Sequence, residues 1–443
     1  MGGELVEVVT VERICTDELK AHVGERVLLK GWALRIRVLG GVAFLMVRDA
    51  RSIAQIVFRD AGGLAMLNDL LLESAVEVEG LVIETTQTTD GVEIVDPLLS
   101  VVSLAVEPPP FDLFRPELEA SLPTALDHAG LALRHASRRA ALRVASASAN
   151  GFRSGLREQG FTEIFTPKIV SSSTESGAEV FRLDYYGRPA FLAQSPQFYK
   201  QMMVDVFERV FEVGSVFRAE PHNTGRHLSE YVSLDAEMGF IDGPETVMSC
   251  LRDVAESMVN SVRIAMEELG IDLRRALPRV PDEVPIVHFS GAQTLLSEAI
   301  GEDLSGEPDL APDHERWLCE WAEREFGSEF LFVLGYPLVK RPFYTHPDPD
   351  RPGSSLGFDL LFRGVEIATG GQRLHHYSDY LDALSDRGEV PEGLEGYLEV
   401  FRHGMPPHGG FALGLERWTA KLTGASNVRE VTAFPRDAGR LVP

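Results

Sequence analysis

The hydrophobic pattern of the chain changes once along its length. In the first hundred residues, short runs rich in Val, Ile and Phe are broken by Gly or Asp, and they lie at 26–34, 41–49, 52–60, 75–84 and 91–102. Runs of this length and composition predict β-strands. Residues 67–74, LNDLLLES, predict a helix between the third and fourth strands.

Five strands with one inserted helix are typical of a small closed β-barrel of the oligonucleotide-binding (OB) type. Residues 107–119, EPPPFDLFRPELE, interrupt regular structure with their prolines and predict a linker. We therefore expect a barrel domain over residues 1–106 and a hinge over 107–137.

From about residue 138, longer segments of helical period alternate with strand-like runs. Helices are predicted at 138–160, 245–270 and 314–327, and strands at 161–170, 190–194, 209–219, 233–241, 329–337, 357–362 and 364–369. No internal repeat interrupts this order. The pattern predicts an α+β domain over 138–443, with a mixed, mainly antiparallel sheet.

The composition is that of a globular protein, with 44% hydrophobic and 25% charged residues. No apolar run approaches the roughly 18 residues of a membrane span, and the start of the chain, MGGELVEVV, does not resemble a secretory signal. The three cysteines, Cys15, Cys250 and Cys319, form no metal-binding spacing. We expect a cytoplasmic protein with reduced thiols and no membrane partner.

The formal charge is strongly negative: 42 basic and 67 acidic residues give −25. Taken alone, this total argues against nucleic-acid binding. Residues 30–51, however, carry five basic residues against one acid, a local charge of +4. Such a patch is compatible with phosphate binding and equally with a solvated sheet face.

Residues 216–240, VFRAEPHNTGRHLSEYVSLDAEMGF, place a polar loop between two strand-like runs. The loop carries Arg218, Glu220, His222, Arg226 and His227. Arginine binds phosphate through two parallel hydrogen bonds and stays charged, so a hairpin with inward arginines suits a triphosphate. A surface hairpin with salt bridges is the competing interpretation.

Residues 408–418, HGGFALGLERW, form a glycine-rich strand that runs into a helix starting near Leu415 or Glu416. Small residues let a ligand approach the backbone closely, and Arg417 would lie in the first helical turn. The segment lacks the GK[ST] ending of a Walker loop and the GxGxxG spacing of a dinucleotide site. A purely structural role for the glycines is the alternative.

Together these two segments resemble motifs 2 and 3 of class II aminoacyl-tRNA synthetases, and GFTEIFTPKIV (160–170) resembles motif 1. Within that class, GWALRIRVLGGVAFLMVRDARSIAQIVF, TESGAEVF, FLAQSPQFYKQMM, RPFYTHP, GVEIATGGQRLHHY and FPRDAGRLVP are similar to archaeal-type aspartyl-tRNA synthetases. The resemblance implies a five-stranded OB-fold barrel for anticodon binding, an antiparallel catalytic sheet flanked by helices, and a homodimer.

The resemblance also implies a nucleotide site. Arg218 matches the arginine that binds the α-phosphate of ATP, and Glu220 matches the acid that holds the adenine amino group. Arg226, His227 and Arg417 match residues near the γ-phosphate, and Arg218 and Arg417 are the implied catalytic residues. Phosphoryl chemistry depends mainly on positioning and charge neutralisation, which suits converging cations.

An implied Mg²⁺ ion would be held by Glu366, with Thr369 where relatives often have serine, and Asp359 assisting. Mg²⁺ prefers oxygen ligands and keeps several waters. An ordinary strand acid is the competing interpretation of Glu366.

The implied aspartate-binding residues are Glu175, Ser195, Gln197, Lys200, Asp235 and Arg373. Lys200 and Arg373 match the readers of the side-chain carboxylate, because an unpaired buried charge is costly. Asp235 matches an acid near the substrate ammonium, and Glu175 lies in a segment that resembles a closing loop. No GxSxG or Cys/His signature indicates a protein nucleophile.

In the barrel, Phe44, Gln55 and Glu93 are the implied anticodon contacts, through base stacking and base-edge hydrogen bonds. Two positions depart from the family pattern: Val38 replaces an acid, and Leu34 replaces an aromatic residue or histidine. The hinge departs as well. We expect Leu34 to face the loop at 85–91 and to leave the third anticodon base without a polar reader.

These departures favour an enzyme that charges both tRNA(Asp) and tRNA(Asn) with aspartate, using ATP, and that works with an amidotransferase on the second product. Three alternatives stay open. The first is an aspartyl-tRNA synthetase that is strict for tRNA(Asp). An asparaginyl-tRNA synthetase is disfavoured because Lys200 suits a carboxylate better than an amide. A specialised paralogue would act in metabolite biosynthesis, inhibitor resistance or RNA binding.

Overall fold

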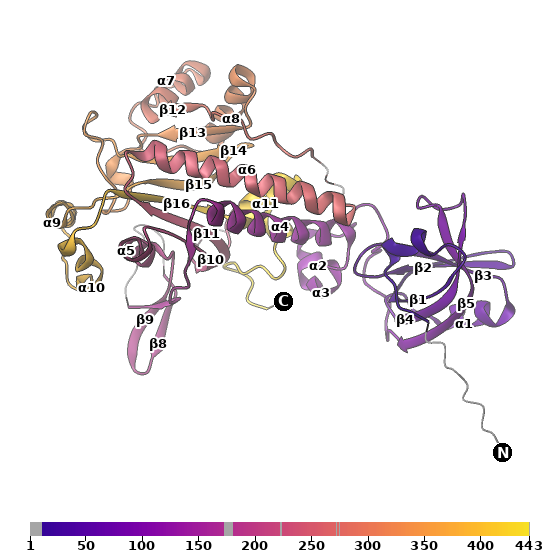
Figure 1. The fold of residues 1–443 in the computed structure, drawn as a ribbon. Coiled ribbons are helices and arrows are strands. Elements are labelled where there is room, and N and C mark those ends of the chain that lie inside the picture. The colour runs from indigo at the N-terminus through magenta and orange to yellow at the C-terminus, as the bar shows by residue number, and fades with distance from the viewer. Residues whose placement is uncertain (1–10, 172–179, 222–223, 272, 274, 443) are drawn as a thin grey trace. The chain divides into compact units, whose positions relative to one another are not determined.

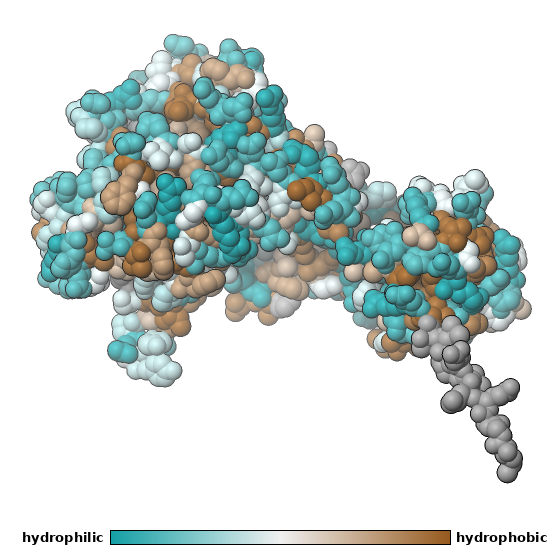
Figure 2. All heavy atoms as spheres, viewed as in Figure 1, coloured by the Kyte–Doolittle hydropathy of each residue, from teal (hydrophilic) through white to brown (hydrophobic). Residues whose placement is uncertain are grey.

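The computed structural model describes residues 11–171, 180–221, 224–271, 273 and 275–442. The chain divides into two compact units, Met1–Ser137 and Arg138–Pro443. Each unit has its own hydrophobic core, and Figure 1 shows the elements of each. No helix in the described ranges is long and apolar enough to cross a membrane, and on the face shown in Figure 2 hydrophilic residues predominate over both units.

The first unit contains a closed five-stranded barrel in the order β1-β2-β3-β5-β4. Its strands are β1 (Arg26–Leu39), β2 (Val42–Arg48), β3 (Ile53–Phe58), β4 (Ala75–Glu84) and β5 (Val92–Ser103). Side chains alternate across each strand, so Ala43, Leu45 and Val47 of β2 point inward to the barrel core while Phe44 and Met46 point outward. This confirms the predicted OB-fold barrel.

The inserted helix, α1 (Ala61–Asp69), begins and ends earlier than the predicted 67–74. Asp60 caps it by accepting a hydrogen bond from the Gly63 amide, at 2.7 Å. Residues 70–74 instead lead into β4. The helix was predicted too far along the chain because Gly62 and Gly63, which have low helix propensity, lie in its first turn.

After the barrel, residues 104–121 contain no helix or strand, and two short helices follow, α2 (Leu122–Asp127) and α3 (Ala129–Ala132). This segment packs on the outside of the barrel. Leu34 is buried here against Phe111, Leu113, Ala125 and Ala132. The expectation that Leu34 faces the 85–91 loop is therefore wrong: that loop follows the end of β4 that pairs with Arg26, eight residues before Leu34 on β1.

The second unit is built on an eight-stranded sheet in the order β12-β13-β14-β15-β16-β11-β10-β6. The strands are β6 (Thr162–Glu163), β10 (Arg209–Phe217), β11 (Glu230–Gly239), β12 (Ile286–His288), β13 (Phe330–Leu334), β14 (Gly357–Phe362), β15 (Val365–Gln372) and β16 (His408–Gly414). Pairing is antiparallel from β13 to β10 and parallel at both edges. The predicted α+β class and mainly antiparallel sheet are confirmed.

The predicted strand over 161–170 is in fact two short strands in different sheets. β6 pairs with β10, whereas β7 (Ile169–Val170) pairs with β9 (Arg188–Leu192), which in turn pairs with β8 (Arg182–Tyr185). Between β6 and β7, both the amide and the hydroxyl of Thr166 donate to Glu212. That side-chain anchor, followed by Pro167, ends the pairing.

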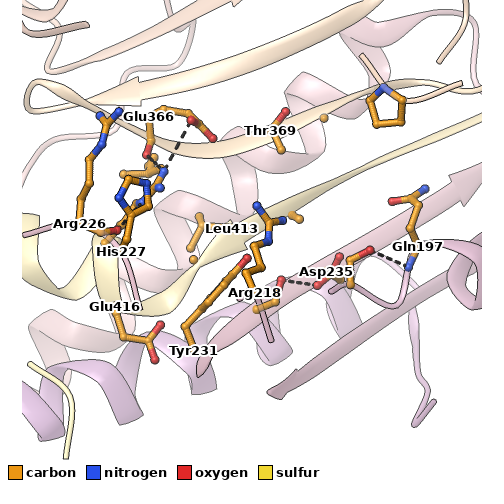
Figure 3. Close-up of a pocket in the computed structure, with 18 of the residues that line it drawn as sticks. Gln197, Arg218, Arg226, His227, Tyr231, Asp235, Glu366, Thr369, Leu413 and Glu416 are labelled. Atoms are coloured by element: carbon orange, nitrogen blue, oxygen red, sulfur yellow. Dashed lines mark hydrogen bonds and ion pairs between the residues drawn. The ribbon is translucent and has the colours of Figure 1, made fainter. Parts of the chain in front are cut away.

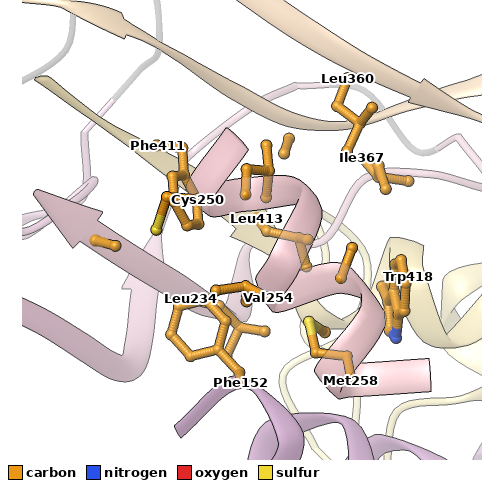
Figure 4. Close-up of a cluster of buried hydrophobic side chains, with 14 of the residues drawn as sticks. Phe152, Leu234, Cys250, Val254, Met258, Leu360, Ile367, Phe411, Leu413 and Trp418 are labelled. Atoms are coloured by element: carbon orange, nitrogen blue, oxygen red, sulfur yellow. The ribbon is translucent and has the colours of Figure 1, made fainter. Parts of the chain in front are cut away.

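Two long helices, α4 (Ala136–Glu158) and α6 (Pro244–Leu269), run side by side over the sheet (Figure 1). Gly151 and Gly155 permit their close approach. A β-carbon on Gly151 would lie 2.6 Å from Met258 Cα, and one on Gly155 would lie 2.8 Å from Ser257 Cβ. The helices cover a core in which Phe152, Val254, Met258, Phe411 and Trp418 are buried (Figure 4).

The remaining helices surround the sheet. They are α5 (Gln197–Phe207), α7 (Phe289–Ile300), α8 (Pro312–Phe326), α9 (Tyr377–Asp386), α10 (Glu395–Leu398) and α11 (Leu415–Thr423), with short 3₁₀ turns at Leu338–Lys340, Val400–His403 and Val428–Glu430. A further 3₁₀ turn, Thr16–His22, belongs to the first unit. Two of the predicted helices, 245–270 and 314–327, match α6 and α8 to within two residues at each end.

Candidate active site

The face of the large sheet turned away from α4 and α6 carries a cavity of about 400 Å³. Strand alternation explains its lining. On β11, Leu234, Ala236 and Met238 belong to the hydrophobic core, so the intervening side chains point to the other side, and Tyr231, Ser233 and Asp235 line the cavity.

Twelve of the residues predicted for ATP, aspartate or metal binding line this one cavity. They come from five separate parts of the chain: Ser195, Gln197, Lys200, Arg218, Glu220, Arg226, His227, Asp235, Glu366, Thr369, Arg373 and Arg417. Glu175 and His222 lie outside the described residues. In Figure 3, Arg226, His227 and Glu366 lie to one side of Arg218, and Gln197 and Asp235 to the other.

A β-bulge in β15 brings the two candidate metal ligands to the same side. The register shifts between Leu360 and Leu361 of β14, which pair with Ala368 and Glu366, so Ile367 is an extra residue. Glu366 and Thr369 are three residues apart and would otherwise point to opposite faces. With the bulge, both point into the cavity while Ile367 and Ala368 pack in the core.

Glu366 is surrounded by cations as well as acids. Arg417, in the first turn of α11 as predicted, donates from Nη1 to the Glu366 carbonyl at 3.1 Å, and the same nitrogen lies 3.6 Å from Glu366 Oε2. Burial raises the pKa of Glu366; Arg417 opposes this shift and Asp359 adds to it. A positive ion or group placed beside Glu366 would therefore stabilise its ionised form.

The oxygen donors of Glu366 and Thr369 suit Mg²⁺, but their surroundings include a cation that the sequence interpretation missed. Arg341 donates from Nη1 to the Thr369 hydroxyl at 3.0 Å and forms an ion pair with Asp359, also at 3.0 Å. Asp359 is thus engaged by Arg341, whereas Glu366 and Thr369 line the cavity directly. The pair Glu366 and Thr369 fits a partly hydrated Mg²⁺.

On the other side of Arg218, the first turn of α5 aligns Gln197 and Lys200 on one helical face. Lys200 is almost completely buried, and its Nζ lies 3.1 Å from Asp235 Oδ1, 3.1 Å from the Phe411 carbonyl and 3.3 Å from Glu237 Oε2. A ligand carboxylate at this end must compete with these acceptors for the ammonium hydrogens.

Glu237 is a further residue that the sequence interpretation missed. Arg373 donates to it from Nε at 2.9 Å, and Lys200 lies on its other oxygen. Burial alone would raise the pKa of Glu237, but the charges of Arg373 and Lys200 and the hydrogen bond from Arg373 outweigh burial and lower it. Its spacing from Asp235, two residues along a strand, was a usable signal.

The glycines of β16 were expected to let a ligand approach the backbone, and only some of them border the cavity. A β-carbon on Gly410 would lie 2.2 Å from Glu237 Oε2, and one on Gly409 would lie 2.7 Å from the Gly371 carbonyl. These two glycines make room for Glu237 and for the neighbouring strand. Gly414, which has open space around it, does line the cavity.

Tyr231 is another lining residue that the sequence interpretation did not select. Its ring lies 5.7 Å from the guanidinium of Arg218. A half-buried aromatic ring that lines a cavity can stack on a nucleobase. Beside it, Glu416 accepts hydrogen bonds from the Val232 amide, and burial raises the pKa of Glu416 to about 7.

The predicted anticodon contacts lie on strands of the barrel in the first unit, on the side of each strand turned away from the barrel core. Gln55 donates to Glu93 at 2.9 Å, and both side chains are buried. Phe44, half-buried on the neighbouring strand, has the Arg37 guanidinium 5.6 Å from its ring. Glu93 also borders an open cavity that Lys20, Arg59 and the 85–87 segment line.

Comparison with known proteins relates both units to described families. Residues 121–438 match the family model "tRNA synthetases class II (D, K and N)", and residues 27–101 match "OB-fold nucleic acid binding domain". The chain is 45% identical over 438 residues, 98% of its length and 99% of the relative's, to the aspartate–tRNA(Asp/Asn) ligase of Deinococcus radiodurans.

A second sequence relative and a solved structure are also similar to this chain. The aspartate–tRNA(Asp) ligase of Pyrococcus abyssi is 37% identical over 97% of this chain and 98% of its own. The crystal structure of asparaginyl-tRNA synthetase from Pyrococcus horikoshii, complexed with asparaginyl-adenylate, superposes with a TM-score of 0.90 at 30% identity, covering 98% of this chain and all of the other.

Proposed function

The chain belongs to the class II tRNA synthetases of the D, K and N group, and from that membership we propose that it ligates L-aspartate to tRNA in an ATP-dependent reaction. The observation that carries the choice of amino acid is the pair of buried cations, Lys200 and Arg373, at one end of the cavity. The near full-length relatives with 37–45% identity, named as aspartate ligases, support the same choice.

The reaction proceeds in two steps. An oxygen of the aspartate α-carboxylate attacks the α-phosphorus of ATP, which gives aspartyl-adenylate and releases pyrophosphate. A hydroxyl of the terminal tRNA adenosine then attacks the activated carbonyl carbon and releases AMP. No protein nucleophile is needed, so the work of the site is to position the reactants and to neutralise charge.

In this proposal Arg218, at the centre of the cavity, contacts the α-phosphate, where charge develops in the first step. Tyr231 supports the adenine ring and Glu220 accepts its amino group. Arg226, His227 and Arg417 neutralise the terminal phosphates. Each of these side chains lines the cavity.

Mg²⁺ is proposed to bind at Glu366 and Thr369, whose oxygens fit its preference for hard donors. When bound, the ion supplies additional neutralisation of the phosphate charge. Glu366 and Thr369 would hold the ion through their side-chain oxygens.

At the amino-acid end, Ser195, Gln197 and Asp235 are placed to hold the backbone groups of aspartate, with Asp235 facing its ammonium. Gln197 Nε2 is buried and has no hydrogen-bond partner among the described residues, which leaves a donor for a ligand oxygen. Arg373 and Lys200 read the side-chain carboxylate. A site organised around charge separates an acid from its amide well. Glu175 is proposed to belong to a loop that closes over the amino acid.

For the tRNA, we propose that residues 1–106 bind the anticodon, 107–137 form a hinge and 138–443 catalyse the reaction. Phe44, Gln55 and Glu93 are the proposed anticodon readers. The relative named for both tRNA(Asp) and tRNA(Asn) favours relaxed tRNA choice. An enzyme of that kind requires an amidotransferase partner to convert aspartyl-tRNA(Asn).

The first experiment measures ATP–pyrophosphate exchange with aspartate and with asparagine. We expect exchange with aspartate and at most weak exchange with asparagine; the reverse result would favour the asparaginyl alternative. No exchange with either would favour a specialised paralogue.

The second experiment compares charging of purified tRNA(Asp) and tRNA(Asn) transcripts, with a third transcript that carries only the anticodon swap. We expect charging efficiencies within about 100-fold, or roughly 2.7 kcal/mol. A larger preference for tRNA(Asp) would mean a strict enzyme.

A further inference from the structure

Glu315 of α8 lies directly behind the nucleotide end of the cavity without lining it. Its side chain is buried, and a single oxygen, Oε2, accepts two hydrogen bonds. One comes from Arg226 Nη1 at 3.0 Å and the other from the backbone amide of Glu366 at 3.1 Å. Nothing in the sequence of α8 marked Glu315 as functional, because its partners lie 89 and 51 residues away.

These contacts join three segments that each supply a nucleotide-site residue. Arg226 comes from the loop between β10 and β11, and Glu366 from β15. Arg417 of α11 completes the arrangement, because its Nε donates to the Arg226 carbonyl at 3.3 Å and its Nη1 to the Glu366 carbonyl at 3.1 Å. Glu315 thus contacts both the Arg226 side chain and the Glu366 backbone.

The geometry at Arg226 leaves most of its hydrogen-bonding capacity for a ligand. Only Nη1 is engaged by Glu315; among the residues that the structure describes, its Nε and Nη2 have no hydrogen-bond partner. The side chain is 31% exposed and borders the cavity. An arginine that is fixed at one nitrogen and open at the other two can bind a phosphate with little further loss of rotamer entropy.

From this geometry we propose that Glu315 is a positioning residue for the nucleotide: it holds Arg226 in place to bind the terminal phosphate of ATP and fixes the β15 backbone beside it. The proposal rests on the proposed function, which assigns Arg226 to that phosphate. Glu315 does not touch the substrate and acts only through Arg226 and Glu366.

The charge of Glu315 matters as well as its position. A glutamine would keep an oxygen acceptor in the same place, but hydrogen bonds to charged groups are the stronger kind. With Glu315 uncharged, Arg226 would lose most of the attraction that holds it, while the surrounding apolar packing of α8 would stay intact. The substitution Glu315→Gln therefore isolates the positioning role.

The test compares wild type, Glu315→Gln, Arg226→Ala and the double variant, with Glu320→Gln as matched control. Glu320 is an exposed acid on the same helix. Equilibrium binding of ATP and of AMP is measured for each protein without amino acid or tRNA. We expect Glu315→Gln to weaken ATP binding by about tenfold and AMP binding by less than about twofold, because AMP lacks the terminal phosphate.

In the Arg226→Ala background, Glu315→Gln should have no further effect on ATP binding, since Arg226 is gone and the glutamine oxygen can still accept from the Glu366 amide. An equal loss for ATP and AMP, or additive losses in the double variant, would overturn the proposal and indicate general damage to the fold. If Glu315→Gln does not fold, Glu315→Asp serves the same comparison, because it keeps the charge but moves it away from Arg226.

The proposed function can fail independently of this inference. Absence of aspartate-dependent exchange in the wild type would reject aspartate activation, while the difference between ATP and AMP binding would still decide the role of Glu315. Conversely, normal exchange with unchanged ATP affinity in Glu315→Gln would reject only the positioning role.

Discussion

At the scale of single residues, the buried charges at the proposed amino-acid end of the cavity are closely matched. Lys200 and Arg373 face Asp235 and Glu237, two cations against two anions. Removing one member leaves the others buried without full compensation, which is far more costly than removing a surface pair.

We expect Lys200→Ala to lower kcat/KM for aspartate in pyrophosphate exchange by about 10³-fold or more, since a buried ion pair loses one partner. ATP binding should change by less than about threefold, because Lys200 lies on the far side of Arg218 from the side chains proposed to bind the terminal phosphates. Exchange at near wild-type efficiency would show that Lys200 does not read the substrate.

Some residues that line or support the cavity could be predicted from the sequence, and others could not. Arg218, Glu366 and Arg417 were found because each lies in a motif of recognisable local form. Glu315 was missed because its partners lie 51 and 89 residues away in the chain. Arg341 opens the RPFYTHP segment, but it was missed because its contacts with Asp359 and Thr369 form only in the folded sheet. Glu237 could have been found, since its alternation with Asp235 on β11 is visible in the sequence.

At the scale of elements, α5, α9, α10 and β16 meet in a buried polar network behind Arg373. Gln201 Nε2 lies 3.0 Å from His408 Nε2, and Tyr397 donates to Gln201 Oε1 at 2.9 Å. Burial lowers the pKa of His408 to about 4. The neutral ring is then the form that accepts from Gln201, with Nδ1–H donating to the Pro406 carbonyl.

This network predicts a pH dependence of stability. The unfolded chain binds a proton at His408 near pH 6.5 and the folded chain only near pH 4, so stability is present above pH 6.5 and is lost as the pH falls from 6.5 to 4. The free energy of unfolding that is lost over this range is on the order of 3 kcal/mol. Urea unfolding of His408→Phe should show a shallower loss over that range; an unchanged slope would contradict the assignment. His403→Phe, at an exposed position, is the matched control.

The pair of helices α4 and α6 gives a second element-scale prediction. Gly→Ala in a helix ordinarily stabilises by about 1 kcal/mol, but at Gly151 the added methyl group would lie 2.6 Å from Met258 Cα. We expect Gly151→Ala to destabilise by about 1–3 kcal/mol, measured by chemical denaturation. Ser154→Ala, exposed on the same helix, should not destabilise. A stabilised Gly151→Ala would mean that the helices separate easily.

Most elements could be predicted because their hydrophobic period is local. The strand alternation of β2 and β11 and the helical period of α6 and α8 are properties of a dozen residues or fewer. The predictions were wrong where a contact between residues far apart in the sequence determines the local structure. Glu212 interrupts the expected strand at Thr166, and the packing of Phe111 and Leu113 buries Leu34.

At the scale of the whole molecule, the proposed homodimer has a candidate contact beside the β6 edge of the large sheet. Phe165 is 83% exposed and Ile169 is 48% exposed, and large apolar residues so exposed commonly mark association surfaces. Both lie in the segment that resembles motif 1.

We expect sedimentation to give about twice 48.8 kDa for the wild type at micromolar concentration. Phe165→Glu should weaken the dimer by at least about tenfold, because an unpaired carboxylate would be buried. Ile300→Glu, an exposed apolar position on α7 near the opposite edge of the sheet, should leave the mass unchanged. A wild-type mass near the monomer would reject the dimer.

The extra residue in β15 has a consequence for how the length of the chain can vary in evolution. The side chains of a strand alternate between its two faces, and the extra residue Ile367 shifts this alternation by one position. Deleting Ile367 would restore the regular alternation of side chains, and either Glu366 or Thr369 would then point into the hydrophobic core. The number of residues in this strand is thus constrained more tightly than the identity of most of them, so homologues that keep the activity should accept substitutions here far more often than single-residue insertions or deletions.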